Sequence, residues 1–125
     1  MITNAGQAVL RGRIEAVTAL FAGNFYMAMS TDNTAVALTD TVLPSELTGN
    51  GLARALVTFA HTVGTNVWTC TNTFTYSGTT TTNVWKIALF DAATGGNLIQ
   101  EALATNFTGF NNAGDNGTFQ LYITV

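Results

Sequence analysis

The sequence predicts a mainly β fold, an antiparallel β-sandwich of jelly-roll or immunoglobulin-like type with one N-terminal helix. An apolar stripe at helical spacing occurs once, between residues 3 and 22. From residue 25 onward apolar and polar residues alternate with a period of two, which is typical of half-buried strands. Turn signals separate these short segments and favour a sandwich or barrel. At 125 residues, we expect a single domain at 1–125, with the helix at 3–22 and the sandwich at 25–125.

The helix is predicted from apolar residues at spacings of four, three and four, namely Leu10, Ile14, Val17 and Phe21. Thr3 or Asn4 can cap its first turn, and Gly23 suits the position just past its end. Arg11 and Arg13 are expected to point outward, into solvent or toward a partner protein.

The segments that follow alternate between extended and irregular chain. Residues 25–31 are predicted as a strand, and residues 32–51 as a long loop that contains the only proline. A loop of this length in a compact domain is either functional or pinned by its neighbours. Extended character returns at residues 52–62.

The strictest alternation lies in residues 67–76. One set of side chains is expected in the core: Trp68, Cys70, Asn72, Phe74 and Tyr76. The other set is expected on the outer face: Val67, Thr69, Thr71, Thr73 and Thr75. Threonine is β-branched, and its hydroxyl lets that face meet water or a neighbouring protein without charge. Together with Thr80 and Thr81 of a predicted tip at residues 77–83, these threonines are the candidate partner interface.

Three more strands complete the predicted sandwich. Residues 85–90 and 97–104 are expected to pair through a hairpin connection in which Gly95 and Gly96 supply positive φ. A final strand at 118–125 places four apolar side chains on one face: Phe119, Leu121, Ile123 and Val125.

The charge pattern excludes several kinds of partner. Charged residues form only 9% of the chain, against about 25% in an ordinary soluble domain. The four basic residues are scattered, so no cluster exists that could bind nucleic acid through its phosphates. We also see no secretory signal and no apolar run of membrane-spanning length, which predicts a soluble protein made in a cytoplasm.

The sequence offers no recognisable active site. His61 has no Cys, His or carboxylate at metal-ligand spacing, and the seven carboxylates are dispersed. Cys70 is the only cysteine, so it cannot form an internal disulfide and is expected to be a small buried side chain. We therefore predict a protein that is not an enzyme, with no catalytic residue, metal ligand or cofactor.

The predicted sheet edges are poorly protected. Monomeric β proteins usually guard edge strands with Lys, Pro or inward-pointing charge, and this chain has one Lys and one Pro. This deficit favours a subunit of an assembly. The alternative is a monomer kept soluble by its Thr and Asn residues.

Six segments along the chain form a further pattern: Asn4-Ala-Gly, Tyr26-Met-Ala-Met-Ser-Thr-Asp32, Ser45-Glu46, Ala53-Arg54-Ala55, Ala88-Leu-Phe-Asp-Ala-Ala-Thr-Gly-Gly-Asn-Leu98 and Ala113-Gly-Asp115. Together they resemble small β-sandwich structural proteins of tailed bacteriophages. The resemblance implies a virion protein and a structural role for three hairpin residues, Asp91, Gly95 and Gly96. It also implies that Arg54 is a polar anchor of the long loop. We expect the Arg54 side chain to pair with Glu46 or with a carbonyl.

These observations favour a non-enzymatic virion structural protein. Our first expectation is a capsid decoration, or cement, protein that bridges neighbouring capsomers. It would bind the major capsid protein or other virion proteins as a homo-oligomer, with a trimer as our guess. The alternative is a tail or head-to-tail component such as a fibre base or adaptor. A third candidate is a carbohydrate-binding attachment module, for which Trp68 and Trp85 could supply an aromatic platform if they are not core residues.

Overall fold

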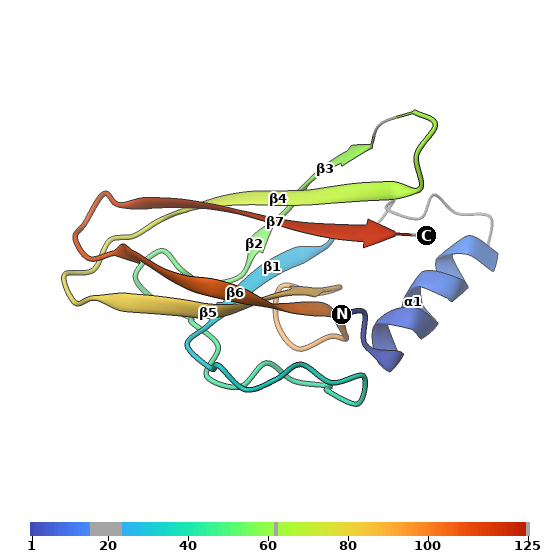
Figure 1. Cartoon of the computed structure of the whole chain (residues 1–125), viewed down its shortest axis with the longest axis horizontal. Helices are drawn as coiled ribbons and strands as arrows, with labels where there is room; N and C mark the ends of the chain where they lie inside the picture. The colour runs from blue at the N-terminus through green and yellow to red at the C-terminus, as the bar shows by residue number, and fades with distance from the viewer. Residues whose placement is uncertain (16–23, 62, 125) are drawn as a thin grey trace.

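The computed structural model describes residues 1–15, 24–61 and 63–124, apart from the side chains of residues 12–15 and 106 (Figure 1). One short N-terminal helix is followed by strands that form two antiparallel sheets, packed face to face. This arrangement confirms the predicted fold class. The elements are α1 (Asn4–Glu15), β1 (Tyr26–Ser30), β2 (Ala55–Leu56), β3 (Thr58–His61), β4 (Val67–Thr75), β5 (Thr82–Phe90), β6 (Leu98–Phe110) and β7 (Asn116–Thr124).

The strands divide into a four-stranded sheet A, in the order β2-β1-β5-β6, and a three-stranded sheet B, in the order β3-β4-β7. The turn at residues 111–115 carries the chain from β6 in sheet A to β7 in sheet B (Figure 1). Both strands are the last in their sheets. One side of the sandwich is therefore built from two edge strands.

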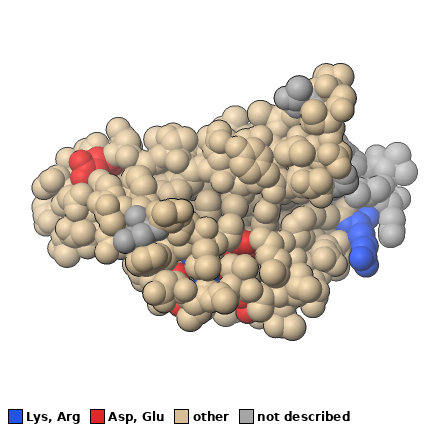
Figure 2. Space-filling model, viewed as in Figure 1, with Lys and Arg blue, Asp and Glu red and all other residues tan. Residues whose placement is uncertain are grey.

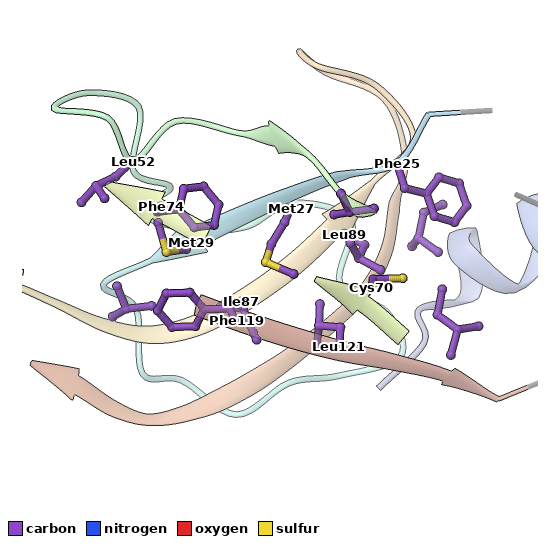
Figure 3. Close-up of a cluster of buried hydrophobic side chains, with 14 of the residues drawn as sticks. Phe25, Met27, Met29, Leu52, Cys70, Phe74, Ile87, Leu89, Phe119 and Leu121 are labelled. Carbon is purple, nitrogen blue, oxygen red and sulfur yellow. The ribbon is translucent and has the colours of Figure 1, made fainter. Parts of the chain in front are cut away.

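Apolar side chains from both sheets meet between them (Figure 3). Sheet A contributes Met27, Met29, Ile87 and Leu89, and sheet B contributes Cys70, Phe74, Phe119 and Leu121. The predicted faces of β7 are confirmed at the described residues, because its burial alternates strictly along the strand. Val125 lies outside the described residues. The period-two pattern thus identified the core side of the strand correctly.

The helix prediction is confirmed for its first part. Thr3 caps α1, since its Oγ1 accepts a hydrogen bond of 2.9 Å from the Gly6 amide. The predicted continuation to residue 22, and the terminating Gly23, lie outside the described residues. Gly6 has a role that propensity alone does not reveal: a Cβ there would lie 1.9 Å from the Ile99 carbonyl oxygen of β6. Only glycine lets α1 approach the sheet this closely.

Two boundary predictions were wrong, both near the tip. β5 begins at Thr82, inside the segment predicted as a turn, and β6 continues to Phe110 instead of ending near residue 104. Register shifts interrupt the β5–β6 pairing, so the alternation that marks a strand is broken in this region. Gly109 lies in the unpredicted part of β6 and weakens the strand pattern further. A Cβ there would lie 2.6 Å from a ring atom of Phe107, so the glycine makes room for aromatic packing.

The long loop after β1 lies against the outer face of sheet A. The Leu47 amide donates a 2.8 Å hydrogen bond to the Met29 carbonyl, and Ser30 forms an isolated bridge with Glu46. Leu43 of the loop is buried in a cluster with Ala28, Ala88, Phe90 and Leu98. The long loop was expected to be either functional or held by its neighbours, and the structure shows that neighbouring residues hold it. The loop covers the part of the outer face of sheet A around this cluster, whereas Leu103 of β6 stays 49% exposed.

Candidate interaction surface

The outer face of sheet B is an array of neutral side chains, which we call the threonine face. It comprises Thr58 and Ala60 of β3, Val67, Thr69, Thr71, Thr73 and Thr75 of β4, and Asn116, Thr118, Gln120, Tyr122 and Thr124 of β7. None of these residues is charged. The register places Thr69 opposite Tyr122, and Thr71 opposite Gln120. Because directly opposed residues share a face, the polar side chains form cross-strand rows.

Hydrogen bonds order the side chains of this face. The hydroxyls of Thr73 and Thr118 lie 2.8 Å apart, and the Thr75 hydroxyl donates to Asn116 Oδ1 at 2.7 Å. The Tyr122 hydroxyl donates to Gln120 Oε1 at 3.1 Å. Side chains that are already held in place lose less entropy when a partner covers them. The threonine face is therefore preorganised for contact with another protein.

The structure brings together some of the candidate interface residues and separates others. The four β4 threonines lie on the threonine face, but Thr80 and Thr81 lie in the loop at the tip of the sandwich. Arg11 is exposed on α1, and the side chain of Arg13 is not among those described. The β7 members of the face were not singled out from the sequence. The alternation in β7 could have identified them, because the polar residues between its buried apolar residues must lie on the opposite face.

The tip is ordered around Tyr76. Its hydroxyl donates to the Thr80 carbonyl at 2.5 Å, and its own carbonyl accepts from the Gly114 amide at 2.7 Å. The Asp115 carboxylate accepts hydrogen bonds from the amides of Asn111 and Asn112 at 2.8 and 2.7 Å. These two amides, Asn112 first, lower the pKa of Asp115. The tip is thus a rigid cap on the sandwich.

Arg54 ties the long loop to the hairpin between β5 and β6. Its Nε and Nη2 donate to the two carboxylate oxygens of Glu46 at 2.5 and 3.1 Å. Its Nη1 donates to the carbonyls of Ala92 and Gly95 at 3.0 and 2.7 Å, and the guanidinium lies 3.5 Å from the centre of the Phe90 ring. A shallow pocket of about 330 Å³ opens beside these residues. Four of the five guanidinium N–H groups are used within the protein, so the arrangement suits an anchor better than a ligand site.

The hairpin itself is held by Asp91. Its carboxylate accepts from the backbone amide and the side-chain amide of Asn97 at 2.7 and 2.9 Å. Gly95 and Gly96 have φ values of 61° and 74°, and a Cβ on Gly96 would lie 2.5 Å from Asp91 Oδ1. Glycine is required there for both reasons.

A second group of charges is buried beneath the long loop. Lys86 of β5 is 1% exposed and Glu101 of β6 is 0% exposed. Lys86 Nζ lies 2.8 Å from Asp32 Oδ2 and 4.0 Å from Glu101 Oε2. Neither carboxylate oxygen of Glu101 has a hydrogen-bond partner. Burial, and then the nearby Asp40 carboxylate, raise the pKa of Glu101 to about 7, whereas the hydrogen bonds from Lys86 and Thr34 lower that of Asp32.

The remaining reactive side chains have structural surroundings. Cys70 is buried, and burial raises the pKa of its thiol to about 12. His61 stacks on Trp68 with ring centres 4.4 Å apart, and Trp85 is half-buried. Within the part of the chain that the structure describes, no group of three His, Cys, Asp or Glu side chains is placed to hold a metal ion. In the same part, no helix has the length and apolar character needed to cross a membrane.

A small β-sandwich that offers an ordered, charge-free face belongs to the class of structural and binding proteins. A family model described as "Podophage GP4 fiber I protein gp80" matches residues 3–121, and the chain belongs to this family of phage fibre proteins. It is therefore a structural protein of the virion, as the resemblance implied. No curated protein matches the chain.

Proposed function

We propose that this chain is a fibre-associated component of the phage tail or of the head-to-tail region, where it is held by contacts with other virion proteins. The family match over residues 3–121 supports this alternative more than the cement function that we first expected. The observation that carries the proposal is the threonine face, because the cores of protein interfaces are poor in charged residues and this face is uncharged and preordered.

The chemistry of the face explains how such a contact forms. Thr, Asn and Gln side chains can exchange hydrogen bonds with water for hydrogen bonds with a partner, and no ion has to be desolvated. The rest of the sandwich supplies rigidity, since the long loop and the hairpin are held together by Arg54. The protein acts as a stiff module whose buried contact area stabilises the assembled particle.

Particle composition tests this location. Quantitative mass spectrometry of purified virions, calibrated against the major capsid protein and the portal protein, measures the copy number of the chain. We expect a copy number tied to the portal or tail. A copy number proportional to the major capsid protein would overturn the tail location in favour of a cement protein. Cryo-electron microscopy of the same particles then shows where the chain lies.

A surface variant tests the threonine face. Particles that lack the chain are incubated with purified wild-type protein, with Thr71→Lys or with Thr41→Lys, and binding is measured by co-sedimentation. Thr71→Lys places a charge in the middle of the face, so we expect it to abolish binding. Thr41→Lys places the same charge on an exposed position of the long loop and serves as the matched control. Equal binding of both variants would show that the face is not the contact.

A further inference from the structure

The second edge of β7 is open. Among the described residues, β7 pairs with β4 alone and ends sheet B. The strand spans Asn116–Thr124 and contains neither a charged residue nor a proline. It faces the viewer in Figure 1, and Figure 2 shows uncharged surface along it. A long edge without such guards is a template for pairing with another strand.

Hydrogen bonding shows which backbone groups face this open edge. The Tyr76 amide donates to the Asp115 carbonyl at 2.7 Å and continues the β4–β7 ladder. In an antiparallel pair the direction alternates, so residues 117, 119, 121 and 123 bond to β4. The outward N–H and C=O groups therefore belong to Asn116, Thr118, Gln120, Tyr122 and Thr124. An independent contact agrees: the Gln100 side chain of β6 donates to the Tyr122 carbonyl at 2.9 Å.

We propose that two copies of this chain associate through β7, antiparallel across a two-fold axis at Gln120. Gln120 is the central residue of the nine-residue strand, and its backbone groups point outward. Pairing of the whole strand with itself then places Gln120 opposite Gln120 of the second copy, and Thr118 opposite Tyr122. The two three-stranded sheets B become one continuous sheet.

The charges and side chains along β7 fit a second copy. The net charge of the chain is −3, yet none of it lies on this strand. Asp32, Asp40 and Glu101 belong to the outer side of sheet A, and Asp115 lies at the tip. A two-fold contact at β7 therefore brings no like charges together, and it is self-complementary by symmetry.

Tyr122 gains most from this contact. Its side chain is 56% exposed in the single chain. In the pair it would pack beside Thr118 of the second copy, an aromatic and β-branched cross-strand pair of the stabilising kind. Its carbonyl can accept from the second copy and still keep the Gln100 bond, because a carbonyl oxygen has two lone pairs. The threonine faces of the two copies become continuous.

A backbone substitution tests the edge. The Gln120 amide is not bonded to β4, so Gln120→Pro removes an outward donor and leaves the β4–β7 ladder intact. Thr71→Lys is the control, since Thr71 lies opposite Gln120 on the central strand. Sedimentation velocity should give the mass of a dimer for wild type and for Thr71→Lys, and of a monomer for Gln120→Pro. A monomeric wild type, or a dimer of Gln120→Pro, overturns the proposal.

Disulfide formation tests the register, and it decides the question even if Gln120→Pro fails to fold. Directly paired residues have Cα atoms about 5.5 Å apart, within the range for a disulfide. Gln120→Cys should therefore form a disulfide-linked dimer under mild oxidation, and the buried Cys70 does not interfere.

The neighbouring positions are the controls for register. In the proposed pair the two copies of residue 118 are offset by four residues, or about 13 Å, too far for a disulfide. Thr118→Cys alone and Tyr122→Cys alone should stay monomeric on non-reducing gels, whereas their mixture should cross-link. Absence of the Gln120→Cys dimer, or equal cross-linking by Thr118→Cys alone, overturns the proposal. The inference does not depend on the location in the virion: Thr71→Lys should lose particle binding and keep self-association, so the two proposals fail separately.

Discussion

Replacement of Glu101 by Gln should change how the stability of this protein depends on pH. Glu101 is fully buried on the outer side of sheet A, and neither of its carboxylate oxygens has a hydrogen-bond partner. Two charged groups face it: Lys86 from β5, which also pairs with Asp32, and Asp40 from the long loop. The Met1 amino group lies against its backbone. Glu101→Gln keeps the size and shape of the side chain and removes its charge.

The direction and size of the effect follow from the pKa. Glu101 has a pKa of about 7 in the folded protein, above its usual value of about 4.3. The folded state therefore binds more protons than the unfolded state between these values, and stability falls as the pH rises through them. At about 1.4 kcal/mol for each pH unit, ionised Glu101 costs the fold between about 3 and 4 kcal/mol above pH 7.

Urea unfolding at pH 5, 6, 7 and 8 checks this prediction. The free energy of unfolding of the wild type should fall across the series, while that of Glu101→Gln should change much less. The difference between the two proteins reports Glu101 together with its coupling to two neighbours: Glu101 lowers the pKa of Asp40, and it partly offsets the burial that lowers the pKa of the Met1 amino group. Parallel pH profiles would refute the reasoning, as would a wild type that gains stability relative to the variant as the pH rises.

Three further predictions concern packing and anchoring. Gly6→Ala should destabilise the protein by about 1–3 kcal/mol despite the better helix propensity of Ala, because its Cβ would overlap a β6 carbonyl. Thermal melts measure this, with Gly49→Ala as the control, since a Cβ at Gly49 has no atom within 4 Å. Arg54→Lys should lower the free energy of unfolding by about 1–3 kcal/mol, since Lys cannot make the bidentate contact with Glu46; an unchanged urea midpoint would contradict this. Cys70 should resist thiol reagents in the folded protein and react in urea, and fast labelling without denaturant would exclude its buried position.

Local patterns were enough to predict much of the fold. Alternation is a property of neighbouring residues, so the core side of β7 and the neutral side of β4 followed from the sequence. The helix start followed from the capping chemistry of Thr3. The predictions failed at the β5–β6 pairing, where register shifts break the alternation. From the sequence, Gly6 was expected only to weaken the helix. Its packing role could not be predicted, because the close approach to β6 joins residues far apart in the chain.

The sequence by itself determined that this protein is a charge-poor, threonine-rich β-sandwich, because composition and side-chain alternation need no knowledge of distant contacts. The resemblance of its segments to phage structural proteins pointed to a virion. The tertiary structure alone decided that β4 and β7 share one face, that the long loop covers part of the outer face of sheet A, and that β7 is an edge strand. Strand order depends on pairing between segments remote in sequence, and many orders satisfy the same local pattern.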